Sequence, residues 1–326
     1  MHLGGANVSH RITSRILLSL LFTNSPSFAQ EQPAATIKVE VSVVNVLCTV
    51  RDSKGRLVSN LEKPDFVIRV DGKPQQISYF SRESELPLTL GLLVDSSVSQ
   101  QRLISHEQDA AAAFFEQVLR DKDMAFLIDF SVNVTLLQDV TNSVEYLQSS
   151  LDGIRVNTSS GNTGPFPTTR SGGTRLYDAV YLGSMDVLKK EAGRKALILI
   201  TDGQDSGSTI SREDALRAAQ ETDTIIYTIL FLDREFYGYG GRGYQGDTVM
   251  REISEETGGR LFRAESREEL EMAFGQISEE LRNQYSLGFT PTNSARDGKF
   301  REIDVDVKSR GYRVQTRKGY YAPKTR

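Results

Sequence analysis

Three oxygen-bearing side chains occur at alternate positions directly after an apolar run, residues 88–94. They are Asp95, Ser97 and Ser99. Because successive side chains of extended backbone point in opposite directions, these three can face one point if the extended geometry continues beyond the run. Mg²⁺ and Mn²⁺ prefer oxygen ligands and keep several waters, so one or two carboxylates with hydroxyls can be sufficient. The spacing therefore predicts a metal site.

Two later segments can supply further oxygen ligands. The glycines of Ser171-Gly172-Gly173-Thr174 permit a tight turn that brings the Thr174 hydroxyl close. Asp202 ends a second apolar run, which is typical of a parallel strand covered on both faces. In open α/β sheets ligands bind at the carboxyl ends of the strands, so both acidic groups would lie there. The predicted metal ligands are Asp95, Ser97, Ser99, Thr174 and Asp202.

Taken in order along the chain, these five positions resemble the metal-ion-dependent adhesion site of von Willebrand factor A domains. The matching motifs are Asp95-x-Ser97-x-Ser99, the Gly-Gly-Thr174 turn and the strand end at Asp202. All five positions of the family pattern are present, and the resemblance extends over about two hundred residues of the chain, from about 86 to 285.

The resemblance implies a role for each of the five side chains. Ser97, Ser99 and Thr174 would bind Mg²⁺, or alternatively Mn²⁺, directly, whereas Asp95 and Asp202 would act largely through water. An Asp or Glu of a protein partner would then fill the remaining coordination position. On this interpretation the chain is a binding module.

The composition is that of a soluble globular protein, with 38% apolar residues, 25% charged residues and a net charge of −4 over 326 residues. That length favours a large domain with a smaller one beside it. The acidic balance, without a basic stripe, argues against a nucleic-acid partner, because counterion release needs clustered Lys and Arg.

The amino-terminal segment has the order of a secretory leader. Arg11 and Arg15 precede a short apolar run, residues 16–22, and small residues around Ala29 suit a cleavage site. We therefore expect residues 1–29 to be a signal peptide and the protein to be secreted or periplasmic. The run is too short to span a bilayer, and no transmembrane segment is expected in the mature chain. A membrane-anchoring or irregular terminus is the alternative.

Strand patterns occupy both ends of the mature sequence, at 36–84 and at 284–322. Alternating apolar residues indicate strands, and Asp71-Gly72 is a hairpin signal, followed by a strand expected at 77–80. We expect the two flanks to fold together as one small β-sandwich; two independent β extensions are the alternative. A metal-binding domain between such flanks resembles a family of secreted bacterial proteins of unsettled role. The lone Cys48 is expected to be a small buried hydrophobe.

Strands and helical patterns alternate between the flanks, over residues 85–283, including one amphipathic helix expected at 176–190. This alternation predicts an α/β fold, a doubly wound and mostly parallel sheet covered on both faces. Two loops, 157–170 and 237–244, are candidate recognition segments, the first as a wall of the metal site. The alternative for the second, rich in Tyr and Gly, is an excursion without a partner.

The residues available for catalysis are few. Once the leader is removed, His106 is the remaining histidine, and no zinc motif or nucleophile-elbow motif is present. We therefore expect a non-enzymatic protein that binds an acidic partner through Mg²⁺. The alternatives are an envelope scaffold in which the metal only orders the loops, and a metal hydrolase. Asp129, Asp178 and Asp205 are candidates for orienting the hydroxyls or waters of the site.

Overall fold

The computed structural model describes residues 43–82, 86–156, 173–232 and 246–324. The expected signal peptide and the candidate loops 157–170 and 237–244 lie outside these ranges, as do Ser171 and Gly172. Among the described residues, no helix combines the length and the apolar character needed to cross a membrane.

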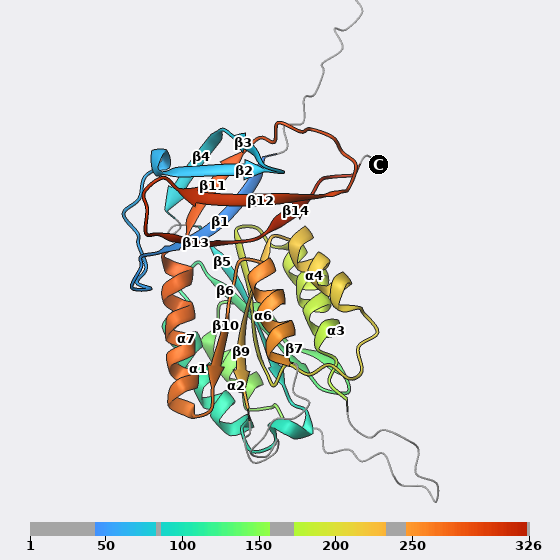
Figure 1. The fold of residues 1–326 in the computed structure, drawn as a ribbon. Coiled ribbons are helices and arrows are strands. Elements are labelled where there is room, and N and C mark those ends of the chain that lie inside the picture. Colours follow the sequence, from blue (N-terminus) through green and yellow to red (C-terminus); the bar gives the residue numbers. More distant parts are fainter. Residues whose placement is uncertain (1–42, 83–85, 157–172, 233–245, 325–326) are drawn as a thin grey trace, which may run out of the picture. The chain divides into compact units, whose positions relative to one another are not determined.

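The described residues form a six-stranded sheet at the centre of the α/β region (Figure 1). Its order is β10-β9-β8-β5-β6-β7, and every neighbouring pair is parallel except β6 with β7. All eight residues of β5, β8 and β9 are buried or nearly so, as expected for parallel strands covered on both faces. The strands are β5 (Leu88–Asp95), β6 (Met124–Phe130), β7 (Val134–Thr141), β8 (Arg194–Thr201), β9 (Thr224–Phe231) and β10 (Leu261–Ala264).

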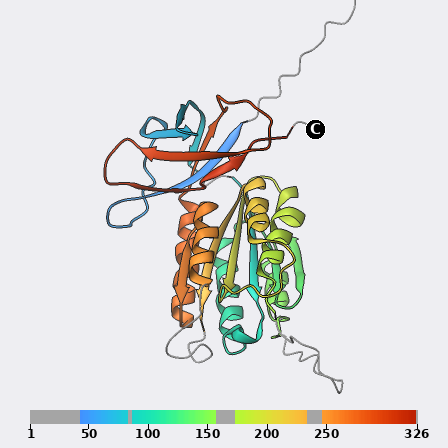
Figure 2. The ribbon, with the colours of Figure 1, turned by 45° about the vertical axis from the view of Figure 1, so that its right-hand side comes forward.

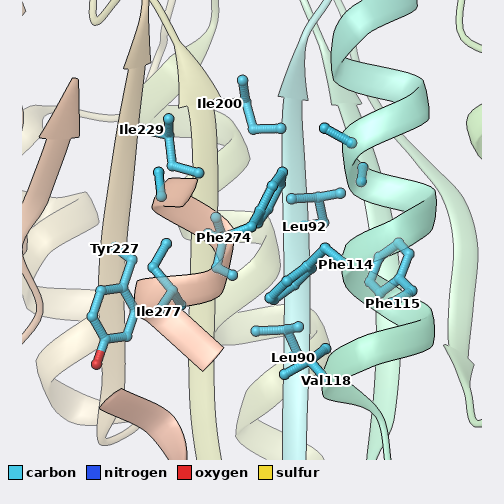
Figure 3. Packing of buried hydrophobic residues seen from close by; sticks show 14 of the residues in the cluster. Leu90, Leu92, Phe114, Phe115, Val118, Ile200, Tyr227, Ile229, Phe274 and Ile277 are labelled. Carbon is cyan, nitrogen blue, oxygen red and sulfur yellow. The ribbon is translucent and has the colours of Figure 1, made fainter. Parts of the chain in front are cut away.

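Helices cover both faces of this sheet, so the predicted doubly wound, mostly parallel α/β fold is confirmed. On one face the rings of Phe114 and Phe274 stack at 4.4 Å between the helices and the sheet residues Leu90 and Leu92 (Figure 3). The helices of that face are α1 (Ile104–Val118), α2 (Val144–Leu151) and α7 (Arg267–Arg282). Those of the other face are α3 (Leu176–Tyr181), α4 (Arg212–Glu221) and α6 (Gly246–Glu256).

The expected single helix at 176–190 needs correction. Only α3 is an α-helix; a wider π-helical segment, Leu182–Val187, and a 3-10 turn, Leu188–Lys190, follow it. Gly183 lies in the wider segment, where an added Cβ would come within 3.2 Å of Leu197 of β8. The apolar spacing of a sequence does not distinguish such a widened turn from a regular α-helix, because the same face stays buried.

The two ends of the described chain form a β-sandwich, as the sequence predicts. Strands from both ends pair within each sheet, as the blue and red strands in Figure 2 show. One shared core, including Cys48, Ile68, Leu287 and Val305, lies between the sheets. The first sheet has the order β13 (Arg313–Thr316), β1 (Val44–Arg51), β11 (Tyr285–Phe289), β4 (Ile77–Arg82); the second has β14 (Gly319–Tyr321), β12 (Phe300–Val307), β2 (Phe66–Val70), β3 (Lys73–Gln75).

The hairpin at Asp71-Gly72 is present, but its second strand differs from the expectation. Both turn residues have positive φ, 48° and 75°, the backbone of a two-residue hairpin. The partner of β2 is the short β3, which comes immediately after the turn, and the expected strand, β4, pairs with β11 in the other sheet. The chain thus changes sheets within a few residues, which local turn chemistry does not reveal.

Candidate metal centre

The two aspartates of the predicted site lie at the carboxyl ends of neighbouring parallel strands. Asp95 is the last residue of β5, and Asp202 directly follows β8. These two strands are paired in parallel, and the last aligned residues are Val94 and Ile200. The sheet extends from β5 to β6 on one side and to β8 on the other, so this edge is the switch point where ligands of such sheets bind. Both side chains are buried, Asp95 completely.

A chain of hydroxyl groups joins the β5 loop to Asp202. The Ser99 hydroxyl donates to Oδ2 of Asp202 at 2.6 Å, and the Oγ atoms of Ser97 and Ser99 are 2.9 Å apart. The extended geometry assumed for this loop ends at Ser97, because Val98–Gln100 is a 3-10 helix. That tight turn, rather than alternation along a strand, brings the two serine hydroxyls together.

Asp95 is fixed by hydrogen bonds to both of its carboxylate oxygens. The backbone N–H of Ser97 donates to Oδ1 at 2.9 Å, and the Thr201 hydroxyl donates to Oδ2 at 2.7 Å. Burial is the larger cause and the charge of the neighbouring Asp202 the second; together they raise the pKa of Asp95 from its ordinary acidic value to about 7. These hydrogen bonds oppose the increase without cancelling it. Two buried carboxylates therefore repel each other at the end of the sheet.

Thr174 lies beside the loop that follows Asp202. Its backbone N–H donates to Oγ of Ser206 at 3.0 Å, and the N–H of Ser206 donates to the Thr174 carbonyl at 3.0 Å. The Thr174 side chain is 6% exposed. Within the described part of the chain, hydrogen bonds connect Ser97 to Asp95 and to Ser99, and Ser99 to Asp202. Thr174 is connected to the loop after Asp202 through Ser206.

The loop after β8 is fastened to the start of α3. Asp205 accepts from the N–H of Leu176 at 3.0 Å and from the Ser208 hydroxyl at 2.5 Å, and that hydroxyl in turn accepts from the N–H of Tyr177. Asp178 accepts from the N–H groups of residues 209 and 210. Two of the three aspartates proposed as orienting groups therefore hold the loops of the site, and burial raises the pKa of the third, Asp129.

The donor set fits a small divalent cation. Hydroxyl and carboxylate oxygens are the ligands that Mg²⁺ and Mn²⁺ prefer. Because Ser99 gives its proton to Asp202 and accepts from Ser97, one lone pair of its oxygen stays available to a cation. A positive charge would also relieve the repulsion between the two aspartates. No three His, Cys, Asp or Glu side chains among the described residues are grouped to hold an ion. A cation would therefore depend on the serine and threonine oxygens.

The sequence reasoning did not identify three residues at this edge. Thr201 donates a hydrogen bond to Asp95, and Ser206 accepts one from the Thr174 N–H. Nothing in the sequence marks these two residues except that they lie close to Asp202. The third is Glu107 on α1, which is fully buried. A signal for it existed, because helical spacing places Glu107 on the same face as the apolar Ala111 and Phe114.

A doubly wound α/β domain with two aspartates and three hydroxyl residues at its switch point defines a Rossmann-like domain with a candidate divalent-metal site. The chain belongs to the von Willebrand factor type A domain family, whose model matches residues 90–276, more than half of the sequence. Domains of this family mediate protein–protein interactions and often bind a divalent metal at the metal-ion-dependent adhesion site.

Several solved structures are similar to this chain at low sequence identity. A von Willebrand factor type A protein from Catenulispora acidiphila is 11% identical with a TM-score of 0.49, over 82% of this chain and 75% of that one. BatB from Bacteroides thetaiotaomicron is 16% identical with a TM-score of 0.45, over 60% and 98%. Proximal thread matrix protein 1 from the mussel byssus is 15% identical with a TM-score of 0.47, over 63% of this chain and 48% of that one. This chain thus spans about half of the mussel protein. Among curated proteins, none is significantly similar to this chain.

Proposed function

We propose that this chain is an exported, non-enzymatic binding module that captures an Asp or Glu of a protein partner through Mg²⁺. Asp95, Ser97, Ser99, Thr174 and Asp202 would hold the cation. The observation that carries the proposal is the hydroxyl chain from Ser97 through Ser99 to Asp202 at the switch point of the sheet. Ser99 is half-buried and Val98 is 43% exposed, so the loop is accessible to a partner.

The contacts of the loops favour binding over the scaffold alternative, in which the metal only orders them. Asp205 and Ser208 accept hydrogen bonds from backbone N–H groups at the start of α3, and Thr201 donates one to Asp95. These bonds already fix the loops without a cation. A cation is therefore not needed for loop order, and it is more useful as a contact for an acidic ligand. The leader pattern supports export, and the scarcity of histidine supports a non-enzymatic role.

The test is the variant Asp95→Ala, with Mg²⁺ affinity measured by isothermal titration calorimetry. We expect affinity to fall about 100-fold or more, because removal of a supporting partner alone costs 10- to 100-fold. Proteins of the source cell's envelope, passed over the immobilised chain, should be retained with Mg²⁺ and released by EDTA. The Asp95→Ala variant should not retain them.

Asp121→Ala is the matched control, since Asp121 is exposed in the turn before β6. Its Mg²⁺ affinity and partner retention should equal those of the wild type. Retention that persists in EDTA, or in Asp95→Ala, contradicts the metal bridge. Loss of thermal stability in EDTA with unchanged retention would instead support the scaffold alternative.

A further inference from the structure

Glu107 is the unusual buried acid of the α/β domain. It lies in the first turn of α1 on the apolar face of that helix, with a fully buried side chain. Neither of its carboxylate oxygens has a hydrogen-bond partner among the described residues. Burying a carboxylate without a partner is costly, so an acid at this position needs a reason other than packing.

The surroundings of Glu107 identify what it faces. Burial is the largest cause that raises its pKa well above the ordinary value, and the charges of Asp95 and Asp202 are the next. Glu107 lies in the first turn of α1, and the apolar face of that helix packs against the sheet beside Val94, the residue before Asp95. The charges of the two acids of the metal site therefore reach Glu107, and no basic residue is among the causes that change its pKa. An ionised acidic group in that place is stabilised by a nearby positive charge; without one, proton uptake is favoured.

The connection between β5 and α1 contains a second unsatisfied polar group. Gln100 is fully buried; its Nε2 donates to the carbonyl of Phe231 at 3.2 Å, whereas its Oε1 has no partner among the described residues. Buried polar groups without protein partners typically bond to ordered water. Gln100 and Glu107 thus both have buried polar atoms without a protein partner, one just before α1 and one in its first turn.

We infer that Glu107 is a third carboxylate of the cation site, a positioning residue that acts through cation-bound water. Direct coordination is disfavoured, because no three acidic side chains among the described residues are grouped around one point. Mg²⁺ keeps several of its waters in proteins, and a carboxylate beyond the ligands accepts hydrogen bonds from them. This inference rests on the proposed cation site and adds a residue to it that the five-position pattern lacks.

The test compares Glu107→Gln with Glu116→Gln, an identical change at an exposed position of the same helix. We expect Glu107→Gln to weaken Mg²⁺ binding about tenfold, measured by calorimetry with the metal alone. The same variant should melt at a higher temperature in EDTA, because a neutral amide avoids the cost of burying an acid near Asp95 and Asp202. Glu107→Asp, which keeps the charge, should recover part of the affinity. Glu116→Gln should change neither quantity.

Opposite signs for cation affinity and metal-free stability are the signature of the inference. A merely structural Glu107 would give a lower melting temperature and an unchanged Mg²⁺ affinity, which overturns it. If the wild type binds Mg²⁺, Asp95→Ala does not and Glu107→Gln binds as the wild type does, the inference fails while the proposed function stands. If the wild type binds no divalent cation, both are overturned.

Discussion

Two glutamates of the α/β domain, Glu107 and Glu280, are equally buried and have opposite surroundings. Glu280, on α7, forms ion pairs with Arg51 of β1 at 2.5 Å and with Arg260 at 2.7 Å. The carboxylate oxygens of Glu107, on α1, have no hydrogen-bond partner among the described residues, and the charges of two aspartates raise its pKa in addition to burial. A buried acid with basic partners holds elements together. A buried acid without such partners destabilises the folded protein, and a cation bound nearby can offset that cost. Glu280 thus connects β1 of the sandwich to α7 of the α/β domain. Glu107, the same residue type, belongs instead to the inferred cation site.

The largest expected effect is at the paired glutamate. Glu280→Gln leaves two guanidinium groups facing a neutral amide, so we expect the free energy of unfolding to fall by about 3 kcal/mol, measured by urea denaturation. Mg²⁺ affinity should not change. Glu279→Gln, at the exposed neighbouring position, is the control and should be neutral. Equal stability changes, of the same sign, in Glu280→Gln and Glu107→Gln would remove the contrast between the two acids.

The second prediction concerns pH. Without a cation, Asp95 has a pKa of about 7 in the folded protein and about 4 in the unfolded chain. The folded state therefore binds the Asp95 proton more tightly than the unfolded state does. The stability that this protonation contributes is present at low pH and is lost as pH rises through 7. Between pH 8 and pH 5.5 we expect a gain of about 2 kcal/mol in EDTA, measured by urea denaturation at each pH.

Saturating Mg²⁺ should reduce that gain, because the cation favours the ionised form of Asp95 that the proton removes. The variant Asp95→Asn should show none of the gain in stability that comes from Asp95. Its pH dependence therefore measures the contribution of all other titrating groups. An identical pH dependence in the wild type and in Asp95→Asn would show that the aspartate does not titrate in this range.

The smallest expected effect is at Thr201, which orients Asp95. Thr201→Val removes the donor to Oδ2 of Asp95 and the acceptor for the N–H of Gly203. We expect a loss of about 1 kcal/mol in stability and about a tenfold loss in Mg²⁺ affinity. Thr228→Val is the matched control, since Thr228 is buried in β9 and its hydroxyl contacts Ser254. It should lose comparable stability without losing affinity; equal affinity in both variants would contradict a role for Thr201 in the site.

Sequence patterns were sufficient for the class of fold and for placing Asp95 and Asp202 at the carboxyl ends of parallel strands. Continuous apolar runs identified β5 and β8 as buried parallel strands, and an acid at the end of each identified the sheet edge where ligands bind. They failed where the conformation depends on neighbours distant in the sequence. The 3-10 turn at Val98–Gln100, the widened helix after Tyr181 and the change of sheet between β3 and β4 leave apolar spacing almost unaltered.

What the sequence determined by itself is therefore local chemistry: which segments are apolar enough to be buried, and which carboxylates and hydroxyls follow them. Only the tertiary structure decided the environment of each acid. Glu107 and Glu280 are the same residue on two amphipathic helices, and only packing gives one of them two guanidinium partners and the other two aspartate neighbours. The physical reason is that burial and long-range charge set the energy of an ionised group, and both are properties of the folded chain.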